Sequence, residues 1–188
     1  MFSKQKLSYA LRYAPELYAL GAWTDGTDSW TTISNKFGGA DWTLVGCGDF
    51  DGDGRDSVVM TYNSGQMFYT ADLDGATASL GALSWTGWEV RAIGDFAGDG
   101  RDDMVLFHQD TGTMVMLANG SPDTYTSIGQ LDASDWFVVG AGDYNNDQKD
   151  DLLVRQYSTG MLGYYSGGNT SAWNVLGYGV DMNWTVIA

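Results

Sequence analysis

An acidic segment with a fixed spacing of carboxylates occurs three times in the sequence, at residues 48–56, 94–103 and 142–151. In the first copy, Asp49, Asp51 and Asp53 occupy alternate positions, so a tight turn can direct all three carboxylates toward one point. The glycines between them permit the backbone angles that such a turn needs. Gathered carboxylates repel one another unless a hard cation with about six to eight oxygen ligands lies between them. The segments are therefore predicted to bind calcium.

The formal net charge of −15, from 24 acidic and 9 basic residues among 188, argues against nucleic acid or an anionic membrane as a partner. Twelve of the acids lie in the three segments, four in each. Three bound calcium ions would bring the charge to about −9, so the acidity is largely a property of the predicted metal sites. The same turns could instead remain solvated and empty. No apolar run reaches the roughly 18 residues of a membrane span, so none is expected.

Residues outside these segments offer little for catalysis. His108 is the single histidine, so neither a triad nor a zinc site can be built around it, and a surface turn is expected. Cys47 is the single cysteine, and its apolar neighbours favour a small buried residue over a reactive thiol. Asp102 and Asp103 could serve a glycosidase, but the metal segments already account for them. The sequence predicts no enzyme, no catalytic residue and no organic cofactor.

The acidic segments belong to a longer repeat that tryptophan marks. Trp42, Trp88, Trp136 and Trp184 recur at spacings of 46, 48 and 48 residues, and each opens a short apolar strand. After the acidic segment, a second strand is predicted at residues 58–60, 104–106 and 152–154. A turn containing glycine leads to a third strand at residues 67–69, 114–116 and 162–164, and a fourth passes through residues 80–81, 128–129 and 176–177. Four short antiparallel strands in each repeat are typical of a propeller blade.

The chain is therefore expected to be one all-β domain, a β-propeller of four four-stranded antiparallel blades. Three blades span residues 42–87, 88–135 and 136–183. The fourth combines residues 184–188 with residues 1–41, in which 7–13, 17–20 and 30–33 resemble the second, third and fourth strands. If the two ends met, Trp184 would precede Trp42 by 46 residues, which matches the other repeats. Such closure leaves no open sheet edge; the alternatives are an open slice of a longer propeller and a ring completed by a second copy.

The motif Gly-Asp-Phe-x-Gly-Asp-Gly-Arg-Asp-Asp after a Trp-x-Val-Val-Gly strand resembles the FG-GAP/VCBS repeats of integrin α-subunit propellers and bacterial surface proteins. The resemblance covers essentially the whole chain. It implies that calcium is held by side chains at loop positions 1, 3, 5 and 9 and by the main-chain carbonyl at position 7. Propellers of that family usually have about seven blades, so a count of four departs from the pattern.

This resemblance implies three ligand sets, in what we call the first, second and third loops (residues 49–57, 95–103 and 143–151). The first set is Asp49, Asp51, Asp53, the Arg55 carbonyl and Ser57, where serine is a poorer ligand than aspartate. The second is Asp95, Asp99, the Arg101 carbonyl and Asp103, with water in place of the ligand that Ala97 lacks. The third and fullest is Asp143, Asn145, Asp147, the Lys149 carbonyl and Asp151, although Gln148 replaces a glycine. Residues 1–8 contain no acid, so two or three structural calcium ions are expected.

The resemblance also implies a non-catalytic recognition or adhesion module for a glycan or protein ligand. Trp30, Tyr125 and Trp173 stand before the fourth strands, where they could stack on sugars, meet a protein, or be covered by the next blade. The alternatives are a propeller domain of a polysaccharide-processing enzyme and a purely structural repeat of a large surface protein. Loops of this kind would bind calcium weakly, which suits the millimolar calcium outside cells, so an extracellular or cell-surface protein is expected. A monomer is also expected. Residues 1–7 lack the apolar stretch of a signal peptide, so either the protein is intracellular or a leader lies outside the given sequence, and the second is expected.

Overall fold

A computed structural model describes residues 10–14, 19–23, 30–34, 41–62, 66–71, 76–82 and 86–179. This part of the chain is all-β, with two three-residue 3-10 turns as its only helical elements. No helix in it is long and apolar enough to cross a membrane. The chain divides into two compact units, Met1–Ser84 and Trp85–Ala188. The prediction of an all-β protein built from four-stranded antiparallel sheets is confirmed, whereas the single domain and the blade count stay predictions.

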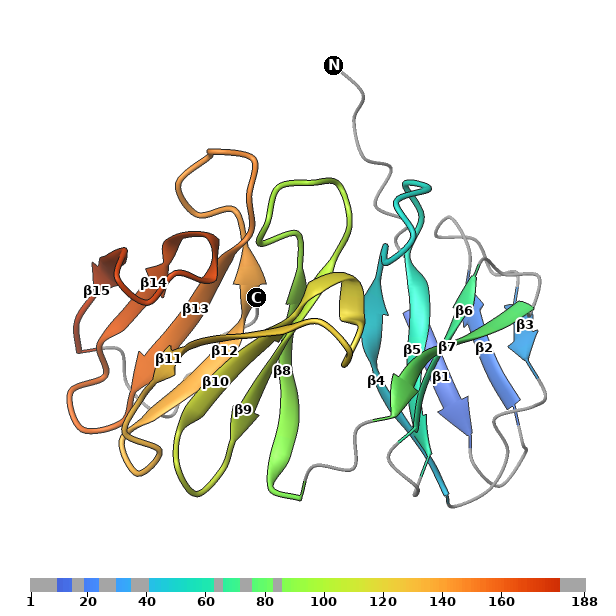
Figure 1. The fold of residues 1–188 in the computed structure, drawn as a ribbon, viewed down its shortest axis with the longest axis horizontal. Coiled ribbons are helices and arrows are strands. Elements are labelled where there is room, and N and C mark those ends of the chain that lie inside the picture. Colours follow the sequence, from blue (N-terminus) through green and yellow to red (C-terminus); the bar gives the residue numbers. More distant parts are fainter. Residues whose placement is uncertain are drawn as a thin grey trace. The chain divides into compact units, whose positions relative to one another are not determined.

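The first unit contains two antiparallel meanders (Figure 1). One is three-stranded, with β1 (Ala10–Ala14), β2 (Ala19–Trp23) and β3 (Trp30–Ser34) as successive neighbours. The other is four-stranded, and its strands are β4 (Trp42–Gly48), β5 (Ser57–Tyr62), β6 (Gln66–Ala71) and β7 (Ala76–Ala82). The four strands predicted for the blade at residues 42–87 are all present in this sheet.

The second unit contains two four-stranded meanders (Figure 1). Its first sheet consists of β8 (Trp88–Gly94), β9 (Asp103–His108), β10 (Thr113–Leu117) and β11 (Tyr125–Gln130). Its second sheet consists of β12 (Trp136–Gly142), β13 (Asp151–Gln156), β14 (Leu162–Tyr165) and β15 (Trp173–Gly177). A 3-10 turn follows the third strand of each sheet, η2 (Ala118–Gly120) and η3 (Ser166–Gly168).

A shared bulge shows which strands correspond between the sheets. In the fourth strands β7, β11 and β15, the register skips one residue each, namely Leu80, Ile128 and Leu176. The register between β2 and β3 skips Ile33 in the same way. Strands β1, β2 and β3 therefore correspond to the second, third and fourth strands of the other sheets, as predicted. The predicted first strand of this sheet, residues 184–188, lies outside the described residues.

The bounds of the two N-terminal strands differ from the prediction. The sequence placed them at residues 7–13 and 17–20, whereas β1 spans Ala10–Ala14 and β2 spans Ala19–Trp23. Ala14, expected in the turn, is the last residue of β1. This sheet lacks the acidic loop and the glycine turn that mark strand ends elsewhere, and a short apolar run does not by itself fix where a strand stops.

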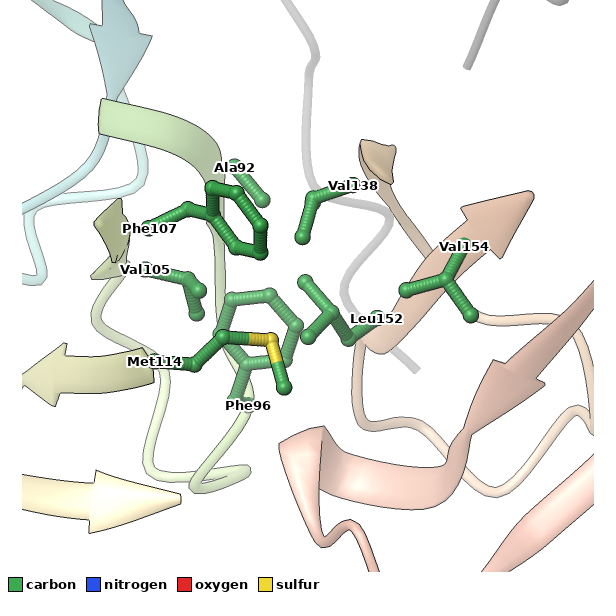
Figure 2. Packing of buried hydrophobic residues seen from close by; sticks show 8 residues of the cluster. All are labelled: Ala92, Phe96, Val105, Phe107, Met114, Val138, Leu152 and Val154. Carbon is green, nitrogen blue, oxygen red and sulfur yellow. The ribbon is translucent and has the colours of Figure 1, made fainter. Parts of the chain in front are cut away.

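The core of the second unit lies between its two sheets, where β8 contacts β12 (Figure 2). The buried side chains are Ala92, Phe96, Val105, Phe107 and Met114 from one sheet and its loop, and Val138, Leu152 and Val154 from the other. Fully burying one such large apolar side chain contributes about 1.5–3 kcal/mol. Phe96 belongs to the second loop and is only 2% exposed, so the core anchors that loop directly.

Of the repeated tryptophans, Trp136 packs against the core between the two sheets of the second unit. The rings of Trp42 and Trp88 contact the residue paired with them on the next strand of their own sheet. Their ring centroids lie 5.0 Å from that of Tyr62 and 5.2 Å from that of His108, respectively. Trp184 lies outside the described residues. In both sheets the tryptophan forms the last residue pair between the first and second strands, at the end opposite the acidic loop.

Candidate metal centres

Each acidic loop connects the first and second strands of a four-stranded sheet. The residue pairs that close the loops are Gly48–Ser57, Gly94–Asp103 and Gly142–Asp151, the last rungs of each ladder. The ninth loop position thus belongs to the last residue pair of the ladder, and the first position directly follows the glycine of that pair on the opposite strand. In the second unit, the second and third loops lie at the same end of their sheets (Figure 1). Strand pairing and the turn therefore place the predicted ligands of each loop at one end of its sheet, but among the described residues only the first loop brings oxygens of three acidic side chains within 4.8 Å of one another.

The first aspartate of each loop organises the turn by accepting main-chain N–H groups. The Asp49 carboxylate accepts from Gly52, Asp53 and Gly54 at 2.7, 3.1 and 2.8 Å. The Asp95 carboxylate accepts from Gly98, Asp99 and Gly100 at 2.7, 3.0 and 2.9 Å. The Asp143 carboxylate accepts from Asp147 and Gln148 at 3.1 and 3.0 Å. Hydrogen bonds to a charged acceptor contribute about 1.5–3 kcal/mol each, so this carboxylate sets the loop conformation.

The aspartate at loop position 5 accepts a hydrogen bond from the main-chain N–H of position 7 in all three loops. The N–H groups of Arg55, Arg101 and Lys149 donate to Asp53, Asp99 and Asp147 Oδ1 at 2.8, 3.0 and 2.9 Å. In the first loop, oxygens of Asp49, Asp51 and Asp53 all lie within 4.8 Å of one another. A single cation could contact all three carboxylates. That the carbonyls of Arg55, Arg101 and Lys149 are ligands stays a prediction.

The ninth position is buried in every loop. Ser57, Asp103 and Asp151 are 4%, 1% and 0% exposed. Burial raises the pKa of the Asp103 carboxyl above 3.8, although the N–H groups of Asn119 and Ala97 donate to it at 2.9 and 3.2 Å. Burial likewise raises the pKa of Asp151, which accepts from Gly167 and Tyr144 at 3.0 Å each. Nearby loop carboxylates raise both pKa values further, so a cation here would offset an existing electrostatic cost.

The third position differs most among the loops. Asp51 offers a carboxylate, and Ala97 offers no ligand, as the sequence showed. Asn145 presents its nitrogen: Nδ2 donates to Asp147 Oδ2 at 3.0 Å and to Asp151 Oδ1 at 3.4 Å. Its Oδ1 accepts from the Asp147 N–H at 2.8 Å. The amide thus links the two carboxylates as a cation would, and it must turn over before Oδ1 can serve as the predicted ligand.

A residue that the sequence did not single out contacts the second loop through its main chain. Asn119, in η2, has a left-handed backbone with φ of 51°, and its N–H donates to Asp103. Its side-chain Oδ1 is buried and takes no hydrogen bond from the described residues. A buried oxygen without a donor suits a cation, and the main chain of its residue bonds to the loop in which Ala97 leaves a ligand short. The donor chemistry of the second loop therefore fits a hard cation.

Two other residues near the loops were missed. Ser166, in η3, accepts through Oγ from Asn145 and Asn174 Nδ2, at 3.2 Å each. Asp150 bonds to the second loop, with its Oδ2 accepting from the Asp95 N–H at 2.9 Å. The sequence did carry a signal for Asp150, because Asp56, Asp102 and Asp150 repeat at loop position 8. No such signal exists for Ser166, because the corresponding 3-10 turn of the other sheet begins with Ala118.

Cys47 and His108 take no part in these sites. Cys47 is half-buried rather than buried as predicted; burial, and then the charge of Asp56, raise the pKa of its thiol to about 12, which disfavours the reactive thiolate. His108 is the last residue of β9. Its Nδ1 accepts from the N–H groups of Asp110 and Thr111 at 3.3 and 3.4 Å, which ties down the following turn. The prediction of a surface turn is therefore wrong in position: His108 is half-buried at the end of a strand and stabilises the turn that follows it.

Comparison with known proteins identifies no family. No family model matches the sequence, and no curated protein matches it. Among solved structures, a protein of unknown function from Bacteroides caccae aligns over 92% of this chain and 58% of its own length, with 11% identity and a TM-score of 0.46. A chain of a nidogen–laminin complex aligns over 88% of this chain and 73% of its own, with 10% identity and a TM-score of 0.40. The chain spans 58% of the first of these structures, and membership of the FG-GAP/VCBS repeats stays a prediction.

Proposed function

We propose that this protein is a calcium-binding, non-catalytic recognition module of the β-propeller class, which meets a glycan or protein ligand outside the cell or at its surface. The observation that supports it most is the common geometry of the three loops. In each, the first aspartate binds main-chain N–H groups of the turn, and later positions carry further oxygens. In the first loop three carboxylates approach within 4.8 Å of one another.

The choice of ion follows from the donors. The predicted ligands are carboxylate, hydroxyl, amide and main-chain oxygens, which favour a hard cation over zinc or copper. Calcium tolerates the unequal ligand sets of the three loops, whereas magnesium demands near-octahedral geometry. His108 ends the strand that Asp103 begins, which separates the two residues by about 16 Å at roughly 3.3 Å per residue. A structural ion is therefore proposed, because the single histidine of the sequence lies at the far end of this strand.

The four sheets are proposed as the blades of one propeller. The three-stranded sheet β1–β3 lacks a partner beside β1 among the described residues, and residues 184–188 would supply it. Removing residues 184–188 should then expose an edge and several apolar side chains, each worth about 1.5–3 kcal/mol when buried. The truncated protein should melt far lower or aggregate. A melting temperature equal to that of the full chain would contradict closure by both termini.

Exposed aromatic side chains on the fourth strands support a recognition role. Tyr125, at the start of β11, is 59% exposed, and Tyr178, directly after β15, is 73% exposed. Such rings can stack on sugars or meet a protein partner. Trp173 is different, because its ring lies 5.6 Å from Trp136 and 4.9 Å from Tyr165 and is half-buried. Tyr125 and Tyr178 are therefore the proposed contact residues.

Thermal unfolding with calcium or with a chelator tests the metal assignment. An ion that binds only the folded state stabilises it by about 2.7 kcal/mol for each site at one hundred times its dissociation constant. The melting temperature should rise in millimolar calcium, and much less in equal magnesium. A melting curve that is the same in calcium and in chelator would contradict the calcium proposal.

A glycan array in calcium, with lyase and hydrolase assays on the same panel, tests recognition. Binding without product is expected, and Tyr125→Ala and Tyr178→Ala should weaken it, whereas Thr126→Ala, an exposed neighbour on β11, should not. Product formation would contradict the non-catalytic role. Absence of binding to any glycan and to candidate surface proteins would instead favour a purely structural repeat.

A further inference from the structure

The second and third loops are joined by a reciprocal pair of hydrogen bonds between Asp95 and Asp150. The Asp95 N–H donates to Asp150 Oδ2 at 2.9 Å, although 55 residues separate them. The Asp150 N–H donates back to the Asp95 carbonyl oxygen, also at 2.9 Å. Both residues belong to the second unit. Asp95 and Asp150 therefore form a clamp, the Asp95–Asp150 clamp, between two candidate metal sites.

Each end of the clamp belongs to the machinery of its own loop. The Asp95 carboxylate accepts three N–H groups of the second loop, from residues 98–100. Asp150 lies between Lys149 and Asp151, two predicted ligands of the third loop. Asp151 is itself held by the N–H groups of Tyr144 and Gly167. A change in the backbone at position 150 must therefore displace both the ligands of the third loop and the organiser of the second.

Close packing leaves little room for the two loops to move separately. A Cβ atom built on Gly94 would lie 2.6 Å from Asp150 Oδ2. One built on Gly98 would lie 2.9 Å from Cε of Lys149. Real Cβ atoms essentially never approach so closely. At Gly94 the obstacle is the carboxylate of Asp150, which a hydrogen bond holds in place, whereas at Gly98 it is the flexible side chain of Lys149, and the φ of 74° is what favours glycine there. The second loop thus rests directly on residues 149–150 of the third.

We infer that calcium binding in the second and third loops is positively cooperative and that the Asp95–Asp150 clamp transmits the coupling. This inference rests on the proposed function, because it describes regulation of the same calcium sites. Filling the third loop would fix Lys149 and Asp151, and with them Asp150 and the Asp95 backbone. The second loop then binds its ion with part of its ordering already done, so less conformational entropy is lost. Repulsion between the two cations opposes this effect, but salt near 0.15 M screens it beyond about 8 Å.

Amide resonances provide a separate readout for each loop. The N–H of Gly100 donates to Asp95 Oδ2, and the N–H of Gln148 donates to Asp143 Oδ2, so their NMR shifts report the second and third loops. Calcium is titrated into chelator-treated protein in about 0.15 M salt. Four proteins are compared: the wild type, Asp147→Ala, Asp150→Ala, and the double variant. Asp147 is exposed, and its removal takes one predicted ligand from the third loop only.

Coupling predicts that Asp147→Ala weakens calcium binding at Gly100 by about fivefold or more, the lower end of typical allosteric factors. By linkage, Asp99→Ala should weaken binding at Gln148 by the same factor. In the Asp150→Ala background, Asp147→Ala should change the Gly100 midpoint far less. This double comparison removes the plain effect of losing one negative charge, which is the same in both backgrounds.

The possible outcomes separate the two proposals. Calcium-dependent shifts in both loops, with a Gly100 midpoint that Asp147→Ala leaves unchanged, would overturn cooperativity while calcium binding stands. An equal loss with and without the Asp150 side chain would overturn the bond from the Asp95 N–H to Asp150 Oδ2 as the carrier, since Asp150→Ala removes that bond and keeps the main-chain bond from Asp150 to Asp95. No calcium-dependent shift in either loop of the wild type would overturn the proposed function itself. If Asp150→Ala does not fold, the reciprocal test with Asp99→Ala and Asp147→Ala still decides whether the sites are coupled.

Discussion

The second and third loops adopt one conformation with different residues, and the difference shows what holds the turn. Both have a left-handed backbone at loop positions 4 and 6. Glycine occupies both positions in the second loop, Gly98 and Gly100 with φ of 74° and 89°. Asn146 and Gln148, with φ of 64° and 71°, occupy them in the third. Because side chains at such angles cost about 1–2 kcal/mol outside glycine, hydrogen bonds to the first aspartate must impose the turn.

The two loops also differ in how firmly that aspartate is held. Asp95 is 4% exposed, whereas Asp143 is exposed. The aromatic residue that follows them differs in the same sense, since Phe96 is 2% exposed and Tyr144 is 37% exposed. The second loop is thus anchored in the core and relaxed in its backbone, and the third is open to solvent and strained. Changes at matched positions should therefore have unequal effects.

The largest difference is expected on removing the organising carboxylate. Asp95→Ala should lower the free energy of unfolding by at least about 3 kcal/mol, because three hydrogen bonds to a buried charge are lost and each contributes about 1.5–3 kcal/mol. Asp143→Ala should cost about half as much, since its carboxylate is exposed and accepts two loop N–H groups. Urea unfolding in chelator measures both, with Asp123→Ala as a control for charge. Equal losses would mean that burial does not distinguish the loops.

A smaller effect is expected from the third loop position, where the two loops lack a carboxylate for different reasons. Ala97→Asp adds a ligand to the second loop, and Asn145→Asp replaces an amide whose nitrogen faces Asp147 and Asp151. Each change should tighten calcium binding at its own loop by about tenfold, or about 1.4 kcal/mol. Residue-resolved titration is the measurement. Tightening at neither loop would contradict position 3 as a ligand position.

The backbone contrast predicts a swap with opposite signs. Gln148→Gly should stabilise the protein by about 1 kcal/mol, because it relieves a left-handed side chain. Gly100→Gln should destabilise it by a similar amount. A Cβ atom on Gly100 meets nothing within 4 Å, so the cost there is purely one of backbone conformation. Melting temperatures in chelator decide the point, and two changes of the same sign would show that strain is not what distinguishes the loops.

The sequence predicted what depends on local pattern. The strand predicted at residues 104–106 lies inside β9, and each acidic segment follows a strand that a tryptophan opens, as the repeat predicted. The Asp95–Asp150 clamp could not be predicted, because it joins residues 55 positions apart. Nor could the position of Asn119 beside Asp103, which depends on how η2 folds back over β9. The orientation of the Asn145 amide depends on three neighbours at once, and composition does not reveal it.

The smallest difference between the second and third loops is expected at loop position 9, where both have a buried aspartate. Burial raises the pKa of both Asp103 and Asp151 above 3.8, so folding favours their protonated form. In calcium-free protein this contribution is complete below pH 3.8 and is lost as the pH rises through the raised pKa values. Asp103→Asn and Asp151→Asn cannot ionise, so their stability relative to the wild type should rise with pH across that window.

In calcium the stability of each Asn variant relative to the wild type should instead fall as the pH rises. The ion binds only the carboxylate form, so its affinity for the wild type must fall as these groups take up protons. Urea unfolding in chelator across the acid range, repeated in calcium, measures both trends for the two variants. A pH dependence that both variants share unchanged with the wild type would assign the titration to other carboxylates. A difference between Asp103→Asn and Asp151→Asn would show instead that the buried end of the loop, and not only its turn, distinguishes the two sites.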